Sequence, residues 1–332
     1  MADDLGEGIA DVIRRAEATL GATLRDPRHL EGGHSGVTLV AELDPSKGAE
    51  ERVVIKATPP GRKAVGRHDV LRQARAIAYA AAAVPVPEIL ATSADDPPFF
   101  VMSFETGEAA EPAHDAASSG DDQALVAQRF AAATGLLARL HALDPSPLLD
   151  AGTAPVSPED ELAKWERTLG AVTGDFRVAG EEAFHLLSAR IPDLWRAAFV
   201  HGDFRLGNIL FTGPDPVAVI DWEIWSVGDP RVDLGWYLTF CDPRDFPVIG
   251  FPERRLPPAA EVVAAYERAT GTLVPDLSWF LAFGAFKMGV VMAHNRERHL
   301  SGRHVDPFQE TLPPTIEHLL GRAASLASSE VA

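Results

Sequence analysis

The spacing of apolar residues predicts an N-terminal part built on strands. After a helix over Leu5–Leu20, short runs rich in β-branched residues predict strands at about Leu30, Val37–Leu43, Arg52–Ala57, Glu88–Thr92 and Phe99–Phe104. An alanine-rich run over Val65–Ala83 has helical spacing, and Pro85 and Pro87 end it, because proline lacks the backbone N–H. The pattern therefore predicts a small antiparallel sheet accompanied by helices.

Beyond Thr106-Gly107, a natural hinge, the pattern becomes helical. Residues 109–122 are rich in Ala, Ser, Gly and Asp, which is typical of a mobile surface loop. Helices are then predicted over Gln123–Leu143, Pro158–Leu169, Gly180–Ala189, Pro258–Thr270, Leu277–His299 and Pro314–Ser328. We therefore expect an α+β protein with two domains, 1–105 and 106–332.

The most informative segment, FVHGDFRLGNILFTGPDPVAVID, precedes the fourth of these helices. Its HGD motif ends at Asp203, Asn208 follows five residues later, and an apolar run ends at Asp221, 18 residues after Asp203. Phosphoryl transfer from a metal-bound nucleotide needs one carboxylate to accept the proton of the acceptor hydroxyl, and an Asn and a second carboxylate to hold Mg²⁺. We therefore predict Asp203 as the base and Asn208 and Asp221 as metal ligands. A polar turn between core strands is the alternative, which this spacing argues against.

Three further residues of this segment have predicted roles. His201 is expected to brace the loop through hydrogen bonds of its ring. Arg205 lies where protein kinases commonly carry a Lys, and its guanidinium would neutralise charge on the transferred phosphoryl group. A structural role is an equal alternative for Arg205. Glu223, two residues past Asp221, would lie behind the metal or touch the acceptor, again with a structural role as an equal alternative.

An upstream segment supplies groups suited to a nucleotide. The strand RVVIK ends in Lys56, which is expected to bind the α- and β-phosphates. Before it, the turn EGGHSG would bring backbone N–H groups to phosphate oxygens, because its glycines leave no side chain in the way. Taken alone, the turn also fits an ordinary hairpin. The turn residues expected to contact the nucleotide are Gly33, His34, Ser35 and Gly36.

Kinases orient such a lysine with a Glu of the following helix, and this sequence differs from that pattern. No Glu lies between Lys56 and Glu88, and Gln73 takes the expected position, with Asp69 one turn earlier on the same face. Gln73 is expected to accept a hydrogen bond from Lys56 without adding charge. The residues expected to meet adenine, through backbone groups and apolar side chains, are Met102, Ser103, Phe104 and Glu105.

In order and spacing, these motifs resemble the aminoglycoside phosphotransferase and choline kinase superfamily. HGDFRLGN resembles its catalytic loop, IDWE its metal-binding motif, and GDPRVDL the segment that follows. The resemblance runs from about Gly32 to Leu238. It implies a bilobal protein-kinase-like fold, with a sheet in the small N-lobe and a mostly helical C-lobe. It also implies that Asp233 accepts hydrogen bonds from the catalytic-loop backbone.

The segments GGHSG, RQAR and VPVPEIL resemble one subgroup in particular, which includes the kinase-like domains fused to some acyl-CoA dehydrogenases. The resemblance implies an ATP- and Mg²⁺-dependent kinase, with GTP as the alternative nucleotide. Its acceptor is expected to be an alcohol: an aminoglycoside-like compound, an amino-alcohol or a hydroxyacyl compound. Candidates for the acceptor pocket are Trp165, Trp222, Trp225, Trp236, His294, Asn295 and Arg296.

Two other interpretations are weaker. A nucleotide-binding pseudokinase or scaffold would explain the missing helix Glu, but it has no need of Asp203, Asn208 and Asp221 together. A protein kinase is disfavoured because a compact turn follows Asp221 and leaves no room for a long activation loop.

Composition limits the classes of partner and the compartment that we expect. A net charge of −18 argues against nucleic acid and anionic membranes, which need positive patches, and it is compatible with a cationic substrate. A single cysteine, Cys241, fits a reducing compartment. The start MADD is acidic where a signal peptide is basic, and the apolar stretch Trp279–Ala293 is short for a membrane span and carries Lys287. We expect a cytoplasmic protein whose oligomeric state the sequence leaves open.

Overall fold

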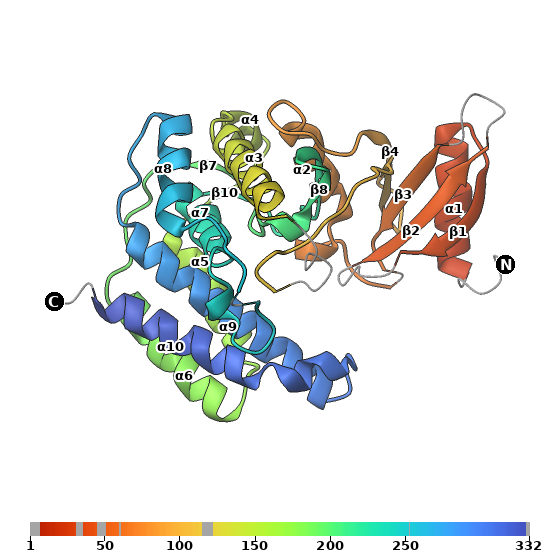
Figure 1. Cartoon of the computed structure of the whole chain (residues 1–332). Coiled ribbons are helices and arrows are strands. Elements are labelled where there is room, and N and C mark those ends of the chain that lie inside the picture. The colour runs from red at the N-terminus through yellow and green to blue at the C-terminus, as the bar shows by residue number, and fades with distance from the viewer. Residues whose placement is uncertain are drawn as a thin grey trace. The chain divides into compact units, whose positions relative to one another are not determined.

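The computed structural model describes residues 7–30, 36–44, 51–59, 61–114, 122–251 and 253–329. Figure 1 shows the elements along the chain, which divides into two compact units. The first unit is Met1–Glu108 with Val217–Trp225, and the second is Ala109–Pro216 with Ser226–Ala332. The sequence placed all of 106–332 in one domain. The structure instead assigns Val217–Trp225, which carries Asp221, to the first unit.

The first unit contains a five-stranded antiparallel sheet of order β1-β2-β3-β5-β4. Its strands are β1 (Leu24–His29), β2 (Val37–Leu43), β3 (Arg52–Ala57), β4 (Ile89–Ser93) and β5 (Phe99–Ser103). The predicted small antiparallel sheet is confirmed, although β1 ends just before the position near Leu30 that the sequence indicated. Lys56 lies on the central strand, opposite Thr38 and Phe100.

Helix α1 (Glu7–Leu20) packs on this sheet. Its buried residues, among them Val12 and Ala16, share one apolar cluster with Ile55 of β3. Side chains alternate between the two faces of a strand, so Lys56 points to the face opposite Ile55. The burial of α1 on one face therefore leaves the other face of β3 for Lys56.

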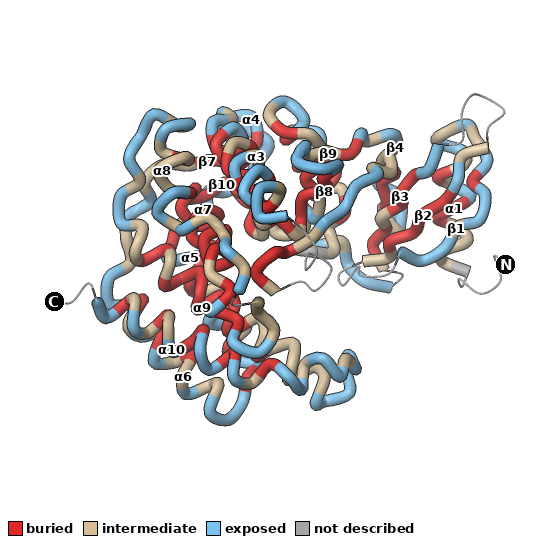
Figure 2. Tube along the Cα trace, viewed as in Figure 1, coloured by how far each residue is buried: buried red, intermediate tan, exposed pale blue. Residues whose placement is uncertain are grey.

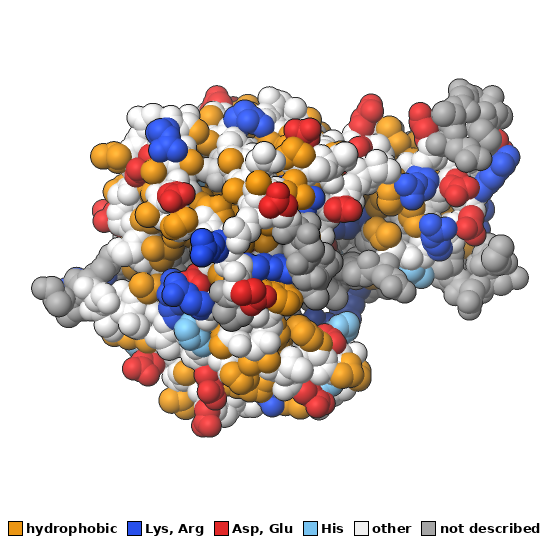
Figure 3. Space-filling view, in the orientation of Figure 1, with side chains coloured by type: hydrophobic (Ala, Val, Ile, Leu, Met, Phe, Trp, Pro, Cys, Tyr) orange, Lys and Arg blue, Asp and Glu red, His pale blue; other side chains and the backbone are white. Residues whose placement is uncertain are grey.

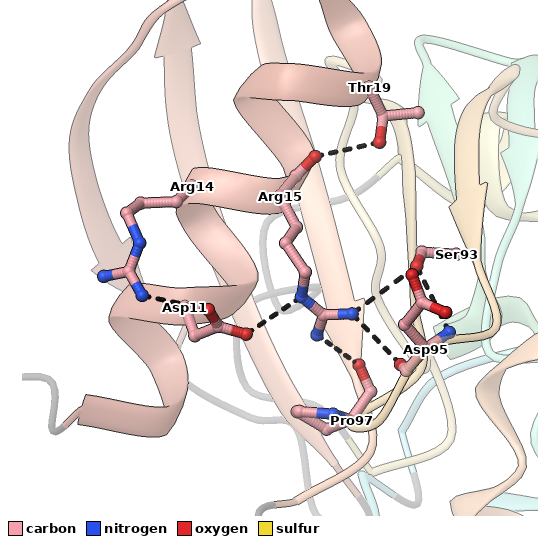
Figure 4. A network of polar contacts seen from close by, with 7 residues as sticks. All are labelled: Asp11, Arg14, Arg15, Thr19, Ser93, Asp95 and Pro97. Carbon is pink, nitrogen blue, oxygen red and sulfur yellow. Dashed lines mark hydrogen bonds and ion pairs between the residues drawn. The ribbon is translucent and has the colours of Figure 1, made fainter.

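Arg15 ties α1 to the turn between β4 and β5, as Figure 4 shows. Its guanidinium donates to the Asp11 carboxylate at 2.9 Å and to the carbonyl oxygens of Asp95 and Pro97 at 3.1 and 2.7 Å. The same group lies 5.2 Å from the ring centre of Phe99. These contacts hold the middle of α1 against the turn between β4 and β5.

Helix α2 (Val70–Ala80) contacts β4 and β5 and is shorter than the predicted Val65–Ala83. Asp69 is its N-cap, because its carboxylate accepts the Arg72 N–H at 2.9 Å. Asp69 therefore starts the helix one turn before Gln73, whose N–H donates to the Asp69 carbonyl oxygen at 3.4 Å. Gln73 itself is buried.

The second unit is mostly helical. Its helices are α3 (Gln123–His141), α4 (Ser146–Asp150), α5 (Pro158–Leu169), α6 (Gly174–Ser188), α7 (Pro230–Leu238), α8 (Ala259–Thr270), α9 (Leu277–Leu300) and α10 (Pro313–Ser329). One sheet joins β6 (Pro155–Val156), β10 (Ser226–Gly228) and β7 (Ala198–Val200) in that order. Strand β8 (Ile209–Thr212) pairs with β9 (Asp215–Val219), whose last three residues belong to the first unit. The six helices predicted for this part are all present; α5 has the predicted bounds, and the other five have shifted ends.

Helix α6 begins six residues before the predicted start at Gly180, at Gly174. The sequence took Gly180 for a boundary, but it lies inside the helix for a packing reason. A Cβ at Gly180 would come within 2.5 Å of the Leu169 side chain, so the glycine lets α5 and α6 approach closely.

Helix α9 is the centre of the second unit and packs against α5, α6, α7 and α10. Figure 2 shows that much of its length is buried. It is longer than the apolar stretch noted in the sequence. By length and composition it could cross a membrane, but 72% of its apolar window is buried inside the fold. This burial is that of a core helix in a globular unit.

Helices α7 and α9 approach each other closely at two glycines. A Cβ at Gly235 would lie 2.2 Å from the Phe280 carbonyl oxygen, and one at Gly284 would lie 2.6 Å from the Gly235 carbonyl oxygen. No side chain fits at either position. The contact fixes the next residue of α7, Trp236, against the next turn of α9, which carries Lys287.

Candidate active site

The HGD loop follows strand β7 in the second unit. The backbone turns at Gly202, whose φ is 85°, a left-handed value that glycine adopts without strain. The imidazole of His201 is buried, and its Nδ1 accepts the Asp203 N–H at 3.2 Å. His201 thus braces the loop through its ring, as the sequence predicted.

Asp233, in the first turn of α7, holds the same loop by its backbone. One carboxylate oxygen accepts the His201 N–H and the other accepts the Gly202 N–H, both at 2.7 Å. His141 Nε2 lies 3.2 Å from Asp233 as well. Burial acts to raise the pKa of Asp233, but the hydrogen bond and charge of His141, helped by His201, outweigh it and hold that pKa below its ordinary value. The predicted support by Asp233 is present.

The carboxylate of Asp203 is held at both oxygens. Oδ1 accepts the indole N–H of Trp236 at 2.8 Å, and Oδ2 accepts the side-chain amide of Asn208 at 2.8 Å. Arg205 Nε lies 3.6 Å from Oδ1, and the Asp203 side chain remains 23% exposed. The orientation of this carboxylate is therefore set by its neighbours while solvent still reaches it.

Asn208 is buried at the end of a short 3₁₀ turn, Leu206–Asn208. Its amide nitrogen also donates to the Asp203 carbonyl oxygen at 2.8 Å. With the nitrogen engaged by Asp203, the amide oxygen is the atom that Asn208 can offer to a cation. Within the described ranges, no group of three or more His, Cys, Asp or Glu residues could hold a metal ion.

Arg205 has an acidic partner that the sequence did not indicate. Glu111 Oε2 lies 3.7 Å from Arg205 Nη1 and accepts the Gly207 N–H at 3.2 Å. Glu111 and Ala113 are buried, and Glu111 packs this part of the predicted surface loop at 109–122 against the catalytic loop. The Ala- and Gly-rich composition of this segment did not indicate the contact of Glu111 with the catalytic loop.

Lys56 of the first unit is paired with Glu223. Its ammonium donates to Glu223 Oε1 at 3.2 Å, with the two side chains 14% and 18% exposed. The sequence did not indicate this ion pair, which joins residues 167 positions apart. Gln73 lines a small pocket together with Lys56. The pocket is lined by Lys56, Gln73, Ile77, Pro87, Met102, Ile220, Asp221 and Trp222.

Asp221 has a left-handed backbone, with φ of 65°. This conformation is uncommon for a residue other than glycine and is concentrated at sites where the surrounding structure requires it. It occurs here at the end of the apolar run, in the wall of the pocket that contains Lys56. The structure thus brings together Lys56, Gln73, Met102 and Asp221 from the predicted set.

Two backbone N–H groups of the predicted adenine-binding segment have partners within the first unit. The Ser103 N–H donates to the Glu88 carbonyl oxygen at 2.9 Å, and the Phe104 N–H donates to the Arg52 carbonyl oxygen at 3.1 Å. These two N–H groups are used within the unit, so Ser103 and Phe104 do not offer them to a ligand. Gly33, His34 and Ser35 of the predicted glycine turn lie outside the described residues. Gly36 is described, and a Cβ there would come within 3.2 Å of the Ala57 carbonyl oxygen.

The four tryptophans proposed for the acceptor pocket separate into two groups. Trp222 and Trp225 are buried in the first unit, where their indole N–H groups donate to the carbonyl oxygens of Val219 and Arg72. Trp236 contacts the Asp203 carboxylate directly. Trp165, on α5, and Trp236 both present their rings to Lys287 of α9, whose ammonium lies 5.3 Å and 3.8 Å from the two ring centres.

The family model described as "Phosphotransferase enzyme family" matches residues 29–282. Among curated proteins, acyl-CoA dehydrogenase family member 10 of Mus musculus is 27% identical over 273 residues, which are 77% of this chain and 25% of that protein. Human acyl-CoA dehydrogenase family member 11 is also 27% identical, over 272 residues, 76% of this chain and 34% of that protein. The chain thus spans a quarter to a third of these relatives.

Among solved structures, a candidate aminoglycoside phosphotransferase of Ralstonia eutropha JMP134 is similar, with a TM-score of 0.75 and 21% identity over 97% of this chain and 98% of that one. At this identity the likeness establishes the fold, and it confirms the predicted kinase-like α+β architecture. A thermostable mutant of aminoglycoside phosphotransferase APH(4)-Ia, in complex with ADP and hygromycin B, has a TM-score of 0.59 and 15% identity over 97% and 99% of the two chains.

Proposed function

Because the chain belongs to the phosphotransferase enzyme family, we propose that it transfers the γ-phosphate of ATP to a hydroxyl group of a small molecule. The observation that carries this proposal is the Asp203 carboxylate, which Trp236 and Asn208 hold at both oxygens while 23% of the side chain stays exposed. A carboxylate fixed in this way orients an incoming hydroxyl and accepts its proton late in the reaction.

The first unit supplies the residues that we assign to the nucleotide. Lys56 binds phosphate oxygens, and Glu223 keeps its ammonium in place through the 3.2 Å ion pair. Met102 of the same pocket contacts the base. The structure of APH(4)-Ia contains ADP, which supports the choice of an adenine nucleotide for a chain of this fold.

Asn208 and Asp221 each offer an oxygen of the kind that Mg²⁺ prefers. The amide nitrogen of Asn208 is engaged by Asp203, which leaves its oxygen for the cation. Asp221 lines the pocket that contains Lys56. Bound Mg²⁺ neutralises charge on the phosphate oxygens and so lowers the barrier to their transfer.

The acceptor is an alcohol, and an aminoglycoside-like compound, an amino-alcohol and a hydroxyacyl compound are the classes to test. A polycationic acceptor would need a cluster of acidic side chains, but two glutamates of α5 and α6 are already paired: Glu161 with Lys164, and Glu181 with Arg177. Acidic and basic side chains are also interspersed on the face shown in Figure 3. These observations do not favour a polycationic acceptor over a neutral or acyl one.

The experiment is an acceptor panel, in which release of ADP from Mg-ATP is measured with each alcohol class. The control is Asp203→Asn, and the phosphorylated product is identified by mass. We expect one class to stimulate ADP release in the wild type and not in the variant. Release that is independent of both acceptor and Asp203 would contradict the proposal.

The alternative is a protein that binds nucleotide without catalysis. It was suggested by Gln73, which stands where kinases have a Glu on the helix. Glu223 provides Lys56 with a carboxylate partner at 3.2 Å, so this argument loses its force. Binding of Mg-ATP with no turnover on any alcohol would favour the alternative. In either case, ligand that binds only the native state raises the free energy of unfolding by about 2.7 kcal/mol at a hundredfold excess over Kd, and the melting temperature rises with it.

A further inference from the structure

Lys287 is a buried cation in the core of the second unit. It lies at the middle of α9, and only 2% of the residue is exposed. Its ammonium donates to the carbonyl oxygen of Gly202, the residue before Asp203. The remaining surroundings include the faces of Trp236 and Trp165, whose ring centres are 3.8 Å and 5.3 Å away. No step assigned so far uses this residue.

A buried lysine is costly, because its charge gives up hydration for few compensating contacts. Burial lowers the pKa of Lys287 to about 8, against the opposing attraction of Asp203. An apolar side chain of similar length would fill the same space at lower cost. Packing alone therefore does not account for a lysine at this position.

The contacts of Lys287 complete a set that fixes the peptide unit leading into Asp203. Asp233 accepts the His201 and Gly202 N–H groups, and His201 Nδ1 accepts the Asp203 N–H. The Gly202 carbonyl, at the other end of that peptide, accepts from Lys287. A buried anion thus holds N–H groups of the loop and a buried cation holds its carbonyl.

Lys287 also reaches the side chain of Asp203 through Trp236. The ammonium lies on the face of the indole, a favourable cation–π position, and so fixes the plane of the ring. The indole N–H in that plane donates to Asp203 Oδ1 at 2.8 Å. The close approach of α7 and α9 at Gly235 and Gly284 sets this geometry.

We propose that Lys287 is a positioning residue for Asp203, which orients the backbone carbonyl before it and the indole that binds its carboxylate. The proposal rests on the proposed function, in which Asp203 is the base. Lys287 does not touch the substrate in this arrangement. Its loss would misdirect the carboxylate and leave the nucleotide-binding residues of the first unit unchanged.

The test uses Lys287→Met, which keeps the length of the side chain but removes its charge and its donor. Lys287→Gln keeps an N–H donor without the charge. Amide hydrogen exchange is followed in peptides that cover 199–208, with the β3 peptide as an internal reference. We expect exchange of the loop amides to rise at least about tenfold in Lys287→Met, less in Lys287→Gln, and not at all in β3.

Kinetics are measured on the same proteins with the acceptor found in the panel. We expect kcat to fall about 10- to 100-fold in Lys287→Met, because a misplacement near 1 Å has effects of this size, with the KM for ATP changed less than about twofold. The melting temperature should be unchanged or higher. Val290→Ala, a buried truncation in the same helix, should lower the melting temperature and leave loop exchange as in the wild type.

Unchanged exchange in Lys287→Met, or a normal kcat with altered exchange, would overturn the proposal. So would failure of both Lys287 variants to fold, since Lys287 would then be required by the whole unit. The exchange measurement needs no substrate, so it separates this proposal from the proposed function. If the wild type turns over no alcohol, the proposed function fails, whereas loop exchange still reports whether Lys287 holds the loop.

Discussion

Lys56 and Glu223 form an ion pair of 3.2 Å within the first unit, although 167 residues separate them in sequence. Both side chains are largely withdrawn from water, with 14% and 18% exposed. A partly buried carboxylate can hold an ammonium in one position, which is the task that a helix Glu would otherwise perform. In this chain the segment that carries Asp221 also supplies that carboxylate.

We predict that Glu223→Gln raises the Kd for Mg-ATP about tenfold, because a charge-assisted hydrogen bond contributes about 1.5–3 kcal/mol and part of it survives in the amide. Titration calorimetry measures the change. Asp69→Asn is the matched control, since Asn also serves as an N-cap for α2. A Kd for Glu223→Gln equal to that of the wild type would show that Lys56 needs no partner to bind the phosphates.

A second prediction concerns the glycine contact between α7 and α9. In Gly284→Ala the new Cβ would lie 2.6 Å from the Gly235 carbonyl oxygen, so the helices must move apart. We expect a loss of about 1–3 kcal/mol in the free energy of unfolding, the usual cost of overpacking. Gly321→Ala is the control, because nothing lies within 4 Å of its Cβ position in α10, and there alanine should stabilise by about 0.5–1 kcal/mol. Equal effects in the two variants would contradict the close approach.

The buried ammonium predicts a dependence of stability on pH. The charged groups that act on Lys287 are Asp203, Asp233, Glu161 and Lys164. Its pKa is about 8 in the fold and 10.5 ordinarily, so between these values the unfolded chain binds more protons. The wild type should therefore gain stability relative to Lys287→Met as pH rises from about 8 to 10.5, by about 3 kcal/mol in all. Urea denaturation of both proteins across this range measures it, and a constant difference would show that Lys287 titrates normally.

Local patterns were sufficient for the sheet of the first unit and for most helices of the second, but they did not indicate α4, α7, β6 or β10. The β-branched run that ends at Lys56 forms β3, and the helical spacing after Gln123 forms α3. Helix boundaries were less predictable where a glycine had a packing role, as at Gly180. The spacing of HGD and Asn208 placed the loop correctly because those residues are neighbours in sequence as well as in space.

The contacts that complete the site could not be read from such patterns. Glu223 meets Lys56 only because Val217–Trp225 belongs to the first unit, and Lys287 meets Gly202 across 85 residues of sequence. Glu111 lies in a stretch whose composition is that of a surface loop, yet it is buried. Each pairing depends on tertiary packing, which the spacing of residues along the sequence does not indicate. The resemblance supplied the one long-range contact that was foreseen, from Asp233 to the loop.

The last prediction separates a chemical role from a metal role. Asp203→Asn removes the proton acceptor, and kcat should fall about 10²- to 10⁴-fold, the usual contribution of a positioned base, with little change in the Kd for ATP. The variant also loses one of the hydrogen bonds that hold the side chain at position 203. Both carboxylate oxygens accept hydrogen bonds, so Asn at this position would present an NH₂ group to the donor of Trp236 or of Asn208.

Asp221→Asn should behave differently. Asn tolerates the left-handed backbone of this position, where φ is 65°, so the fold is kept and the loss is confined to the charge of the carboxylate. We expect weaker binding of ATP in the presence of Mg²⁺, and a difference between wild type and variant that shrinks when Mg²⁺ is left out. Calorimetry with and without Mg²⁺ measures this, and turnover is assayed at saturating nucleotide. Equal losses of nucleotide affinity in the two variants would refute the assignment, as would an Asp203→Asn enzyme with the turnover of the wild type.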